Sequence, residues 1–202
     1  MTEWPAGRFD VIGAFWSLSY PLGAYVETLT SDGIRTRSDP AGGLRQASGF
    51  VDALVGLLAP GGHLLALLFD ADSPEQRLVT RAWETIAPAP FGDRGYTRRI
   101  LTDALASAED RSQGTLRHSH LRGFAVATDA AAARRWFTAA HFKDLRAITG
   151  NRALMADVEE FIAGCTRPDS TVHLPAGVHV IDFHRTNAHQ TDHTDAAERD
   201  DL

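Results

Sequence analysis

Two histidines separated by one residue are the side chains of this sequence with the plainest capacity for chemistry. His118, His120 and Arg122 alternate along a predicted strand, so they would share one face. Since the pKa of histidine lies near neutrality, either ring could act as a general base towards an oxygen or nitrogen nucleophile. The pair is also a weak metal-binding pattern, but no Asp, Glu or Cys at a matching spacing accompanies it, so no metal is expected. A solvated strand face is the competing interpretation.

Further polar side chains follow two apolar segments. Asp70 and Asp72 come after one of them and could bind a substrate amine or act as a base, although stabilising the start of the next helix would explain them nearly as well. Ser19 and Tyr20 follow the other and could hydrogen-bond a substrate. Capping of a following helix is an equally good explanation for the serine.

The remaining reactive side chains receive no role. Cys165 is the single cysteine, which excludes an intramolecular disulfide and a cysteine-based zinc site, and it is expected to be a half-buried structural thiol. His179 and His184 flank the last predicted strand, which is expected to lie far from a bound cofactor, so they are assigned no role. The sequence has no Ser-His-Asp signature, no Gly-x-Ser-x-Gly elbow and no Walker loop.

The elements that must position these groups alternate between strand and helix. Residues 9–15 are mostly apolar without alternation, which is typical of a strand covered on both faces. Asp39-Pro40 begins a helix whose apolar residues recur three and four positions apart up to Leu58. Pro60-Gly61-Gly62 ends this helix, and residues 63–69 form the next buried strand. Strand, crossover helix and strand predict a βαβ unit in a parallel sheet.

Downstream segments continue the mixed pattern. A short helix is expected within 21–30, and the segment from 71 to 115 is expected to form a helical cover over the substrate. The sequence also predicts helices starting at Ser73-Pro74 and at 97–109, 129–142 and 151–164, and strands within 116–128 and at 177–183. From Asn187 the chain is polar and charged, so a domain over 1–186 and a disordered tail over 187–202 are predicted.

Composition limits the classes of partner. The 202 residues fit one domain, and a net charge of -6 without a clustered basic patch argues against nucleic acid. No apolar run approaches the roughly 20 residues of a membrane span, and the N-terminus lacks the features of a signal peptide. A cytoplasmic protein is expected, and the Lys-poor, Ala- and Arg-rich usage suggests a GC-rich bacterial genome.

The strand at 9–15, the crossover helix and the Leu-x-Pro-Gly-Gly-x-Leu turn at Leu58 to Leu64 resemble the fourth and fifth strands of a class I S-adenosylmethionine-dependent methyltransferase. Glu3-Trp4-Pro5 is similar to the linker that precedes the fourth strand. The resemblance covers roughly residues 3 to 70 and extends loosely over the rest. It implies an α/β fold with a partial Rossmann-like methyltransferase sheet, mostly parallel, with a C-terminal antiparallel hairpin and helices on both faces.

The resemblance also implies where S-adenosylmethionine would bind. Such sheets bind ligands at the carboxyl ends of their strands, which places Ala14, Phe15, Trp16 and Ser17 beside the methionine and the transferable methyl group. A sulfonium cation lies well against an aromatic face, so Phe15 or Trp16 could contribute a cation–π contact. Core packing is the competing interpretation of these two rings.

The family's first three strands and glycine-rich cofactor turn would precede Phe9, where this sequence has eight residues. Gly42-Gly43 and Gly61-Gly62 cannot replace that turn because neither follows a strand. The chain therefore resembles the C-terminal part of such an enzyme, and a fragment or one half of a split enzyme is favoured over a degenerate relative. A homodimer or a partner chain would then complete the sheet and cover the edge of its central strand.

The expected function is methyl transfer from S-adenosylmethionine to a small-molecule acceptor, by in-line attack driven mainly by positioning. Whether this chain alone is an enzyme stays open, as do the acceptor and the atom that is methylated. One alternative is a non-catalytic methyltransferase-like subunit that binds a partner protein. Another is a different α/β enzyme without methyl chemistry, because a Pro-Gly-Gly turn is a modest signal by itself.

Overall fold

The computed structural model describes residues 7, 9–30, 33–86 and 94–187. Its elements are, in order, β1 (Phe9–Phe15), α1 (Ser19–Ala24), β2 (Glu27–Thr30), β3 (Gly33–Thr36), α2 (Pro40–Leu57), β4 (Leu58–Phe69), α3 (Pro74–Glu84), α4 (Tyr96–Asp110), β5 (Gly114–Ala127), α5 (Ala130–Arg135), the π-helix η2 (Trp136–His141), α6 (Arg146–Thr149), α7 (Arg152–Cys165) and β6 (Val172–Arg185). Apart from Asn187, the predicted tail lies outside the described residues, and so does Glu3-Trp4-Pro5.

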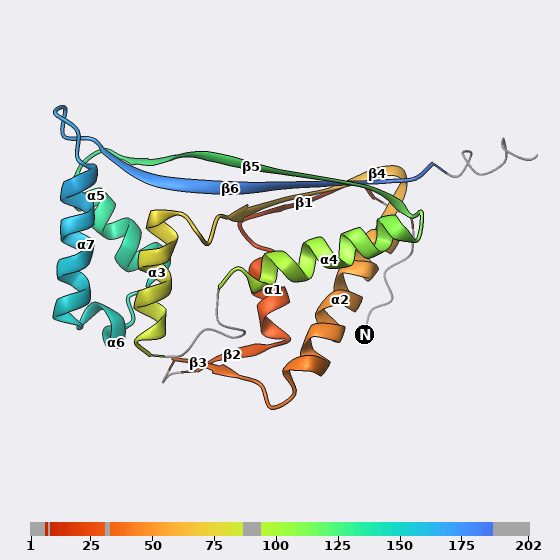
Figure 1. The fold of residues 1–202 in the computed structure, drawn as a ribbon, viewed down its shortest axis with the longest axis horizontal. Helices are drawn as coiled ribbons and strands as arrows, with labels where there is room; N and C mark the ends of the chain where they lie inside the picture. The colour runs from red at the N-terminus through yellow and green to blue at the C-terminus, as the bar shows by residue number, and fades with distance from the viewer. Residues whose placement is uncertain (1–6, 8, 31–32, 87–93, 188–202) are drawn as a thin grey trace, which may run out of the picture.

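The main sheet has the strand order β1-β4-β6-β5 (Figure 1). β1 pairs in parallel with β4, and β6 pairs antiparallel with both β4 and β5. Three of these strands therefore run in one direction, and β6 runs against them. The α/β class, the parallel βαβ unit and the C-terminal antiparallel hairpin are confirmed.

Local sequence explains how the βαβ unit forms. Asp39 caps α2, since its side chain accepts a hydrogen bond from the Gly42 amide at 2.8 Å, and Pro40 occupies the first turn. The Pro-Gly-Gly turn lies inside β4, because the strand starts at Leu58 rather than at His63 as predicted. A Cβ atom on Gly62 would lie 2.8 Å from the carbonyl oxygen of Phe9, so glycine is what lets β1 approach here.

The segment after β1 differs from the prediction. The helix expected within 21–30 starts earlier and ends at Ala24, and Glu27–Thr30 pairs antiparallel with Gly33–Thr36 as the β2–β3 hairpin instead. Three β-branched residues within the predicted range 21–30, namely Val26, Thr28 and Thr30, favour strand over helix. The hairpin lies at the end of the molecule farthest from the main sheet (Figure 1). Helix 129–142 is also modified, because its second half is the π-helix η2.

Two hydrophobic clusters hold the fold together. The first lies between the sheet and helices α1, α2 and α4, and the second packs α3, α5, η2, α6 and α7 against the far end of the β5–β6 hairpin. Among the described residues, no helix has the length and apolar content needed to cross a membrane.

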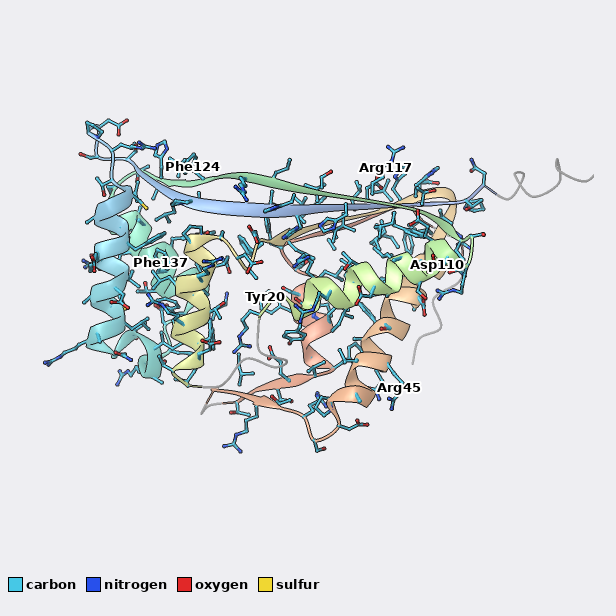
Figure 2. All side chains as sticks on the ribbon, in the orientation of Figure 1. Tyr20, Arg45, Asp110, Arg117, Phe124 and Phe137 are labelled. Atoms are coloured by element: carbon cyan, nitrogen blue, oxygen red, sulfur yellow. The ribbon has the colours of Figure 1, made fainter. Side chains whose placement is uncertain are left out.

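The β5–β6 hairpin twists between these clusters. Ile181 belongs to the first cluster and Leu174 to the second, although their side chains leave opposite faces of an alternating strand. Figure 2 shows the same twist on β5, where Arg117 and Phe124 both project away from the helices despite their opposite parity. Long two-stranded ribbons twist strongly, which lets one hairpin serve both clusters.

The labelled helices all lie on one side of the sheet (Figure 1), whereas the sequence analysis expected helices on both faces. The two helix groups reach opposite faces of the hairpin only through its twist. On the two outer strands of the sheet, β1 and β5, the other face carries exposed apolar side chains, with Val11 at 57%, Phe15 at 56% and Leu121 at 54% exposure. We call this the open face. Among the described residues no helix covers it.

Candidate functional site

The carboxyl ends of β1 and β4 meet at one edge of the sheet. Trp16 follows β1 and its amide donates to the carbonyl of Leu67 at 3.0 Å. Its ring stacks on Phe69 with 4.4 Å between centroids. Trp16 adopts a φ of +59°, a conformation that side chains other than glycine seldom take and that is enriched at functional sites. The aromatic pair therefore marks the edge at which open α/β sheets bind ligands.

A cavity of about 460 Å³ opens beside this pair, and we call it the inner cavity. Trp16 and Phe69 form one part of its wall. The other described lining residues come from α1, β2, β3, α3, α4, η2 and the segments next to them, and include Ser19, Tyr20, Glu27, Gln76, Trp83, Arg94, Tyr96, His141 and Lys143. The lining combines aromatic rings with charged groups, which suits a small polar molecule with an apolar body.

A buried carboxylate stands behind the cavity wall. Glu75, in the first turn of α3, is fully buried, and its Oε1 accepts hydrogen bonds from Trp136 Nε1 and from His141 Nε2, the latter at 3.1 Å. Its Oε2 has no partner among the described residues. The π-helix η2 presents both Trp136 and His141, and such segments are frequent at functional sites. A carboxylate that engages one nitrogen of His141 fixes the ring and leaves Nδ1 free to take a proton.

An ion pair also lines the inner cavity. Arg94 donates to Glu27 at 3.1 Å, and the Tyr96 hydroxyl interacts with the same carboxylate. Burial raises the pKa of Glu27, although the charge of Arg94 and the hydrogen bonds from Tyr96 and Arg94 oppose the rise. Burial and the neighbouring charge of Glu27 also raise the pKa of Tyr96. Arg94 Nε and Nη2 are buried without a partner among the described residues, so this side of the cavity could accept an anionic group.

Three histidines and one aspartate gather at the end of β4, and we call them the histidine cluster. Asp70 Oδ2 lies 2.9 Å from His120 Nε2, and Asp70 Oδ1 lies 3.6 Å from His179 Nε2. His118 Nε2 lies 3.0 Å from His179 Nδ1, and the rings of His120 and His179 stack at 4.6 Å. The ladder that pairs His120 with His179 across β5 and β6 creates this group.

Burial and neighbouring charges shift the pKa of three members of the cluster, Asp70, His118 and His179. Burial raises the pKa of Asp70. Hydrogen bonds from the Asp72 amide and His120, together with the charges of His120 and His179, outweigh this effect, so the pKa lies below its usual value. Burial, the charge of Arg98 and the charge of His120 lower the pKa of His118 and of His179. At neutral pH the cluster therefore pairs a carboxylate with neutral imidazoles at His118 and His179.

The structure separates the residues proposed from the sequence into groups. Trp16, Ser19 and Tyr20 line the inner cavity. Ala14 packs against the core and Phe15 lies on the open face. Ser17 is exposed after β1, and Asp72 is exposed beside the arginines of α3 and α4.

The structure brings other predicted residues together with side chains to which the sequence analysis gave no role. His118, His120 and Asp70 meet each other, and His179, which received no role, completes their cluster. Asp70 supplies the acidic neighbour that was missing from the local spacing of the histidines. Sequence reasoning overlooked Glu75 and His141, although a charged residue inside an apolar helix face would have pointed to Glu75.

Several solved structures overlap with this fold. They include the YcgJ protein of Bacillus subtilis (10% identity, 93% of this chain and 68% of that chain, TM-score 0.40) and a putative methyltransferase of Bacillus halodurans (11% identity, 93% and 68%, TM-score 0.35). Loganic acid methyltransferase with S-adenosylhomocysteine overlaps at 10% identity over 92% of this chain and 64% of that chain, with a TM-score of 0.43. At such TM-scores the overlaps carry no functional argument.

No protein-family model matches the chain. A comparison with curated proteins finds no match either.

Proposed function

We propose that this chain forms the acceptor side of an S-adenosylmethionine-dependent methyltransferase that acts on a small molecule. The observation that carries the proposal is the stacked pair of Trp16 and Phe69, which lies at the carboxyl edge of β1 and β4 beside the inner cavity. The rest of the cofactor site would come from strands that pair with β1, supplied by further polypeptide or by a partner chain. A bacterial, cytoplasmic setting belongs to the same proposal.

The cofactor would lie over the end of β1. There the exposed ring of Trp16 offers a cation–π contact to the sulfonium, as sequence analysis expected for Phe15 or Trp16. Ala14 and Ser17 would flank the methionine, while Phe15 points to the open face and is better placed for contact with another chain. The acceptor would occupy the inner cavity, with Ser19 and Tyr20 as hydrogen-bonding groups and Arg94 towards any negative charge.

Transfer then needs positioning and one proton acceptor. The acceptor's oxygen or nitrogen attacks the methyl carbon, and the carbon–sulfur bond breaks with its electron pair passing to sulfur, which yields S-adenosylhomocysteine. The acceptor's proton passes to His141 Nδ1, because Nε2 faces Glu75. We assign this role to His141 rather than to His118 or His120, since His141 lines the cavity that Trp16 lines and the other two face Asp70 and His179.

Calorimetric titration with S-adenosylhomocysteine tests the proposal. Binding in the micromolar range by the folded chain, weakened by Trp16→Ala about 2- to 30-fold for the loss of about 0.5–2 kcal/mol of cation–π energy, would support it. Trp16→Phe, which keeps an aromatic face, is the matched control and should lose less. If the folded chain binds no S-adenosylhomocysteine at millimolar ligand concentration, either as a monomer or when self-associated, the result would contradict a complete cofactor site here.

The second candidate is a non-catalytic subunit that binds a partner protein. The open face favours it, because exposed apolar side chains that gather on one face of a sheet often mark a surface that binds another protein, and three here are each more than half exposed. β1 adds an edge strand whose outer hydrogen-bonding groups meet no partner strand among the described residues. Failure to bind S-adenosylhomocysteine combined with stable self- or partner association would favour this function.

A further inference from the structure

The histidine cluster has the composition of a metal site. We propose that Asp70, His120 and His179 bind a divalent transition-metal ion of the Zn²⁺ type. Each of the three residues offers one ligand atom, and these atoms lie within 4.8 Å of one another. Imidazole nitrogens suit zinc and its neighbours, and two histidines with one carboxylate leave a coordination position open for water or substrate.

Burial gives the strongest support. The side chains of His179 and Asp70 are only 8% and 10% exposed, and among the described residues His179 Nε2 makes no hydrogen bond. Buried polar atoms in folded proteins nearly always have a partner, so an orphaned imidazole nitrogen beside a carboxylate calls for a ligand. A cation bound between Asp70 and His179 would satisfy this nitrogen.

The supporting residue is His118. Histidines that hold a metal usually use their second ring nitrogen in a hydrogen bond that fixes the ring. His179 meets this condition, because its Nδ1 lies 3.0 Å from His118 Nε2 and its Nε2 is turned towards Asp70. His118 is therefore a positioning residue and not a ligand.

The framework of the site is rigid. Its residues lie at the end of β4 and on β5 and β6, which pair with one another along the sheet. Asp70 also donates its amide hydrogen to Gly177 at 2.9 Å, which ties the carboxylate-bearing residue to β6. Ligands held by paired strands keep their geometry better than ligands on loops. The guanidinium of Arg98 acts on His118 and His179, and its charge opposes a bound cation.

Zinc titration of the complete, tag-free chain after chelator treatment is the experiment. We expect one Zn²⁺ ion per chain by calorimetry and, for Co²⁺, a visible absorption band stronger than that of the hydrated ion. His120→Ala changes a half-exposed ligand and should abolish measurable binding while the circular dichroism spectrum stays unchanged. His118→Ala should weaken binding about 10- to 100-fold, as outer partners of metal ligands do.

Two controls separate this site from other histidines. His63, which bonds Asp182 at 2.8 Å and stacks on His184, lies outside the cluster, and His63→Ala should bind zinc like the wild type. The double variant His189→Ala/His193→Ala removes two histidines of the C-terminal sequence and should also leave binding unchanged.

The proposal is overturned if the wild type binds no zinc at millimolar concentration or if His120→Ala binds it normally. It is also overturned if either control variant, His63→Ala or His189→Ala/His193→Ala, loses zinc binding. The site does not depend on methyl transfer, since the titration needs neither cofactor nor acceptor.

Discussion

Gly177 and Asp70 lie closer together than any other residue at position 177 would permit. The Asp70 amide donates to the Gly177 carbonyl at 2.9 Å. A Cβ atom on Gly177 would lie 2.7 Å from Asp70 Cβ and 2.8 Å from Asp70 Oδ2. The absent side chain of one residue therefore fixes the place of a carboxylate more than a hundred positions earlier in the chain, and with it the geometry of the histidine cluster.

Gly177→Ala should destabilise the chain by about 1–3 kcal/mol, because an added methyl group in a packed site forces neighbours to move. For a domain of this size that corresponds to a Tm lower by roughly 2–12 °C in a thermal scan. Gly123→Ala is the control, since a Cβ there meets nothing within 4 Å, and its Tm should not fall. Equal Tm values for the two variants would disprove the close approach.

Glu75→Ala should cost about 2–4 kcal/mol, because it leaves Trp136 Nε1 and His141 Nε2 without their buried acceptor. Urea denaturation would show the loss as a lower midpoint. Glu84→Ala changes an exposed acid on the same helix and should stay within about 0.5 kcal/mol of the wild type. A similar midpoint for Glu75→Ala would mean that the buried acid does not hold η2 in place.

Alkaline pH should destabilise the chain through Tyr96. Burial and Glu27 raise the pKa of this phenol in the folded state, so above about pH 10 the unfolded chain loses the proton first. Stability then falls as pH rises, by up to about 1.4 kcal/mol per pH unit for one group. Tyr96→Phe should flatten this slope in denaturant titrations between pH 9 and pH 11, whereas Tyr20→Phe, at an exposed position, should reproduce the wild-type slope.

The open face should mediate association. Phe15→Lys adds a charge to an exposed apolar position, so it should change the free energy of unfolding by no more than about 0.5 kcal/mol yet reduce the mass measured by light scattering at high concentration. Arg45→Glu changes an exposed residue of α2, away from this face (Figure 2), and should leave the mass unchanged. Equal masses for wild type and Phe15→Lys would exclude self-association through this face.

Sequence periodicity predicted much of the framework. The strand 9–15, the helix after Asp39-Pro40 and the later helices and strands are all present, because apolar spacing and capping residues act over a few neighbours. The errors fall where local preference was overridden or misjudged. The β2–β3 hairpin lies where part of a helix was predicted. β4 includes the Pro-Gly-Gly segment, which was expected to form a turn before the strand.

The candidate sites divide along the same line. The sequence by itself determined that Trp16 and Asp70 would follow adjacent parallel strands, since a βαβ unit brings carboxyl ends to one edge. Only the tertiary structure decided which side chains meet at each site. It brings Glu75 to His141, and it brings Asp70 to His120 and His179. Each of these contacts joins residues that are at least 50 positions apart, and the contacts depend on strand register and helix packing. No local pattern encodes that register, because it is set by the burial of both hydrophobic clusters at once.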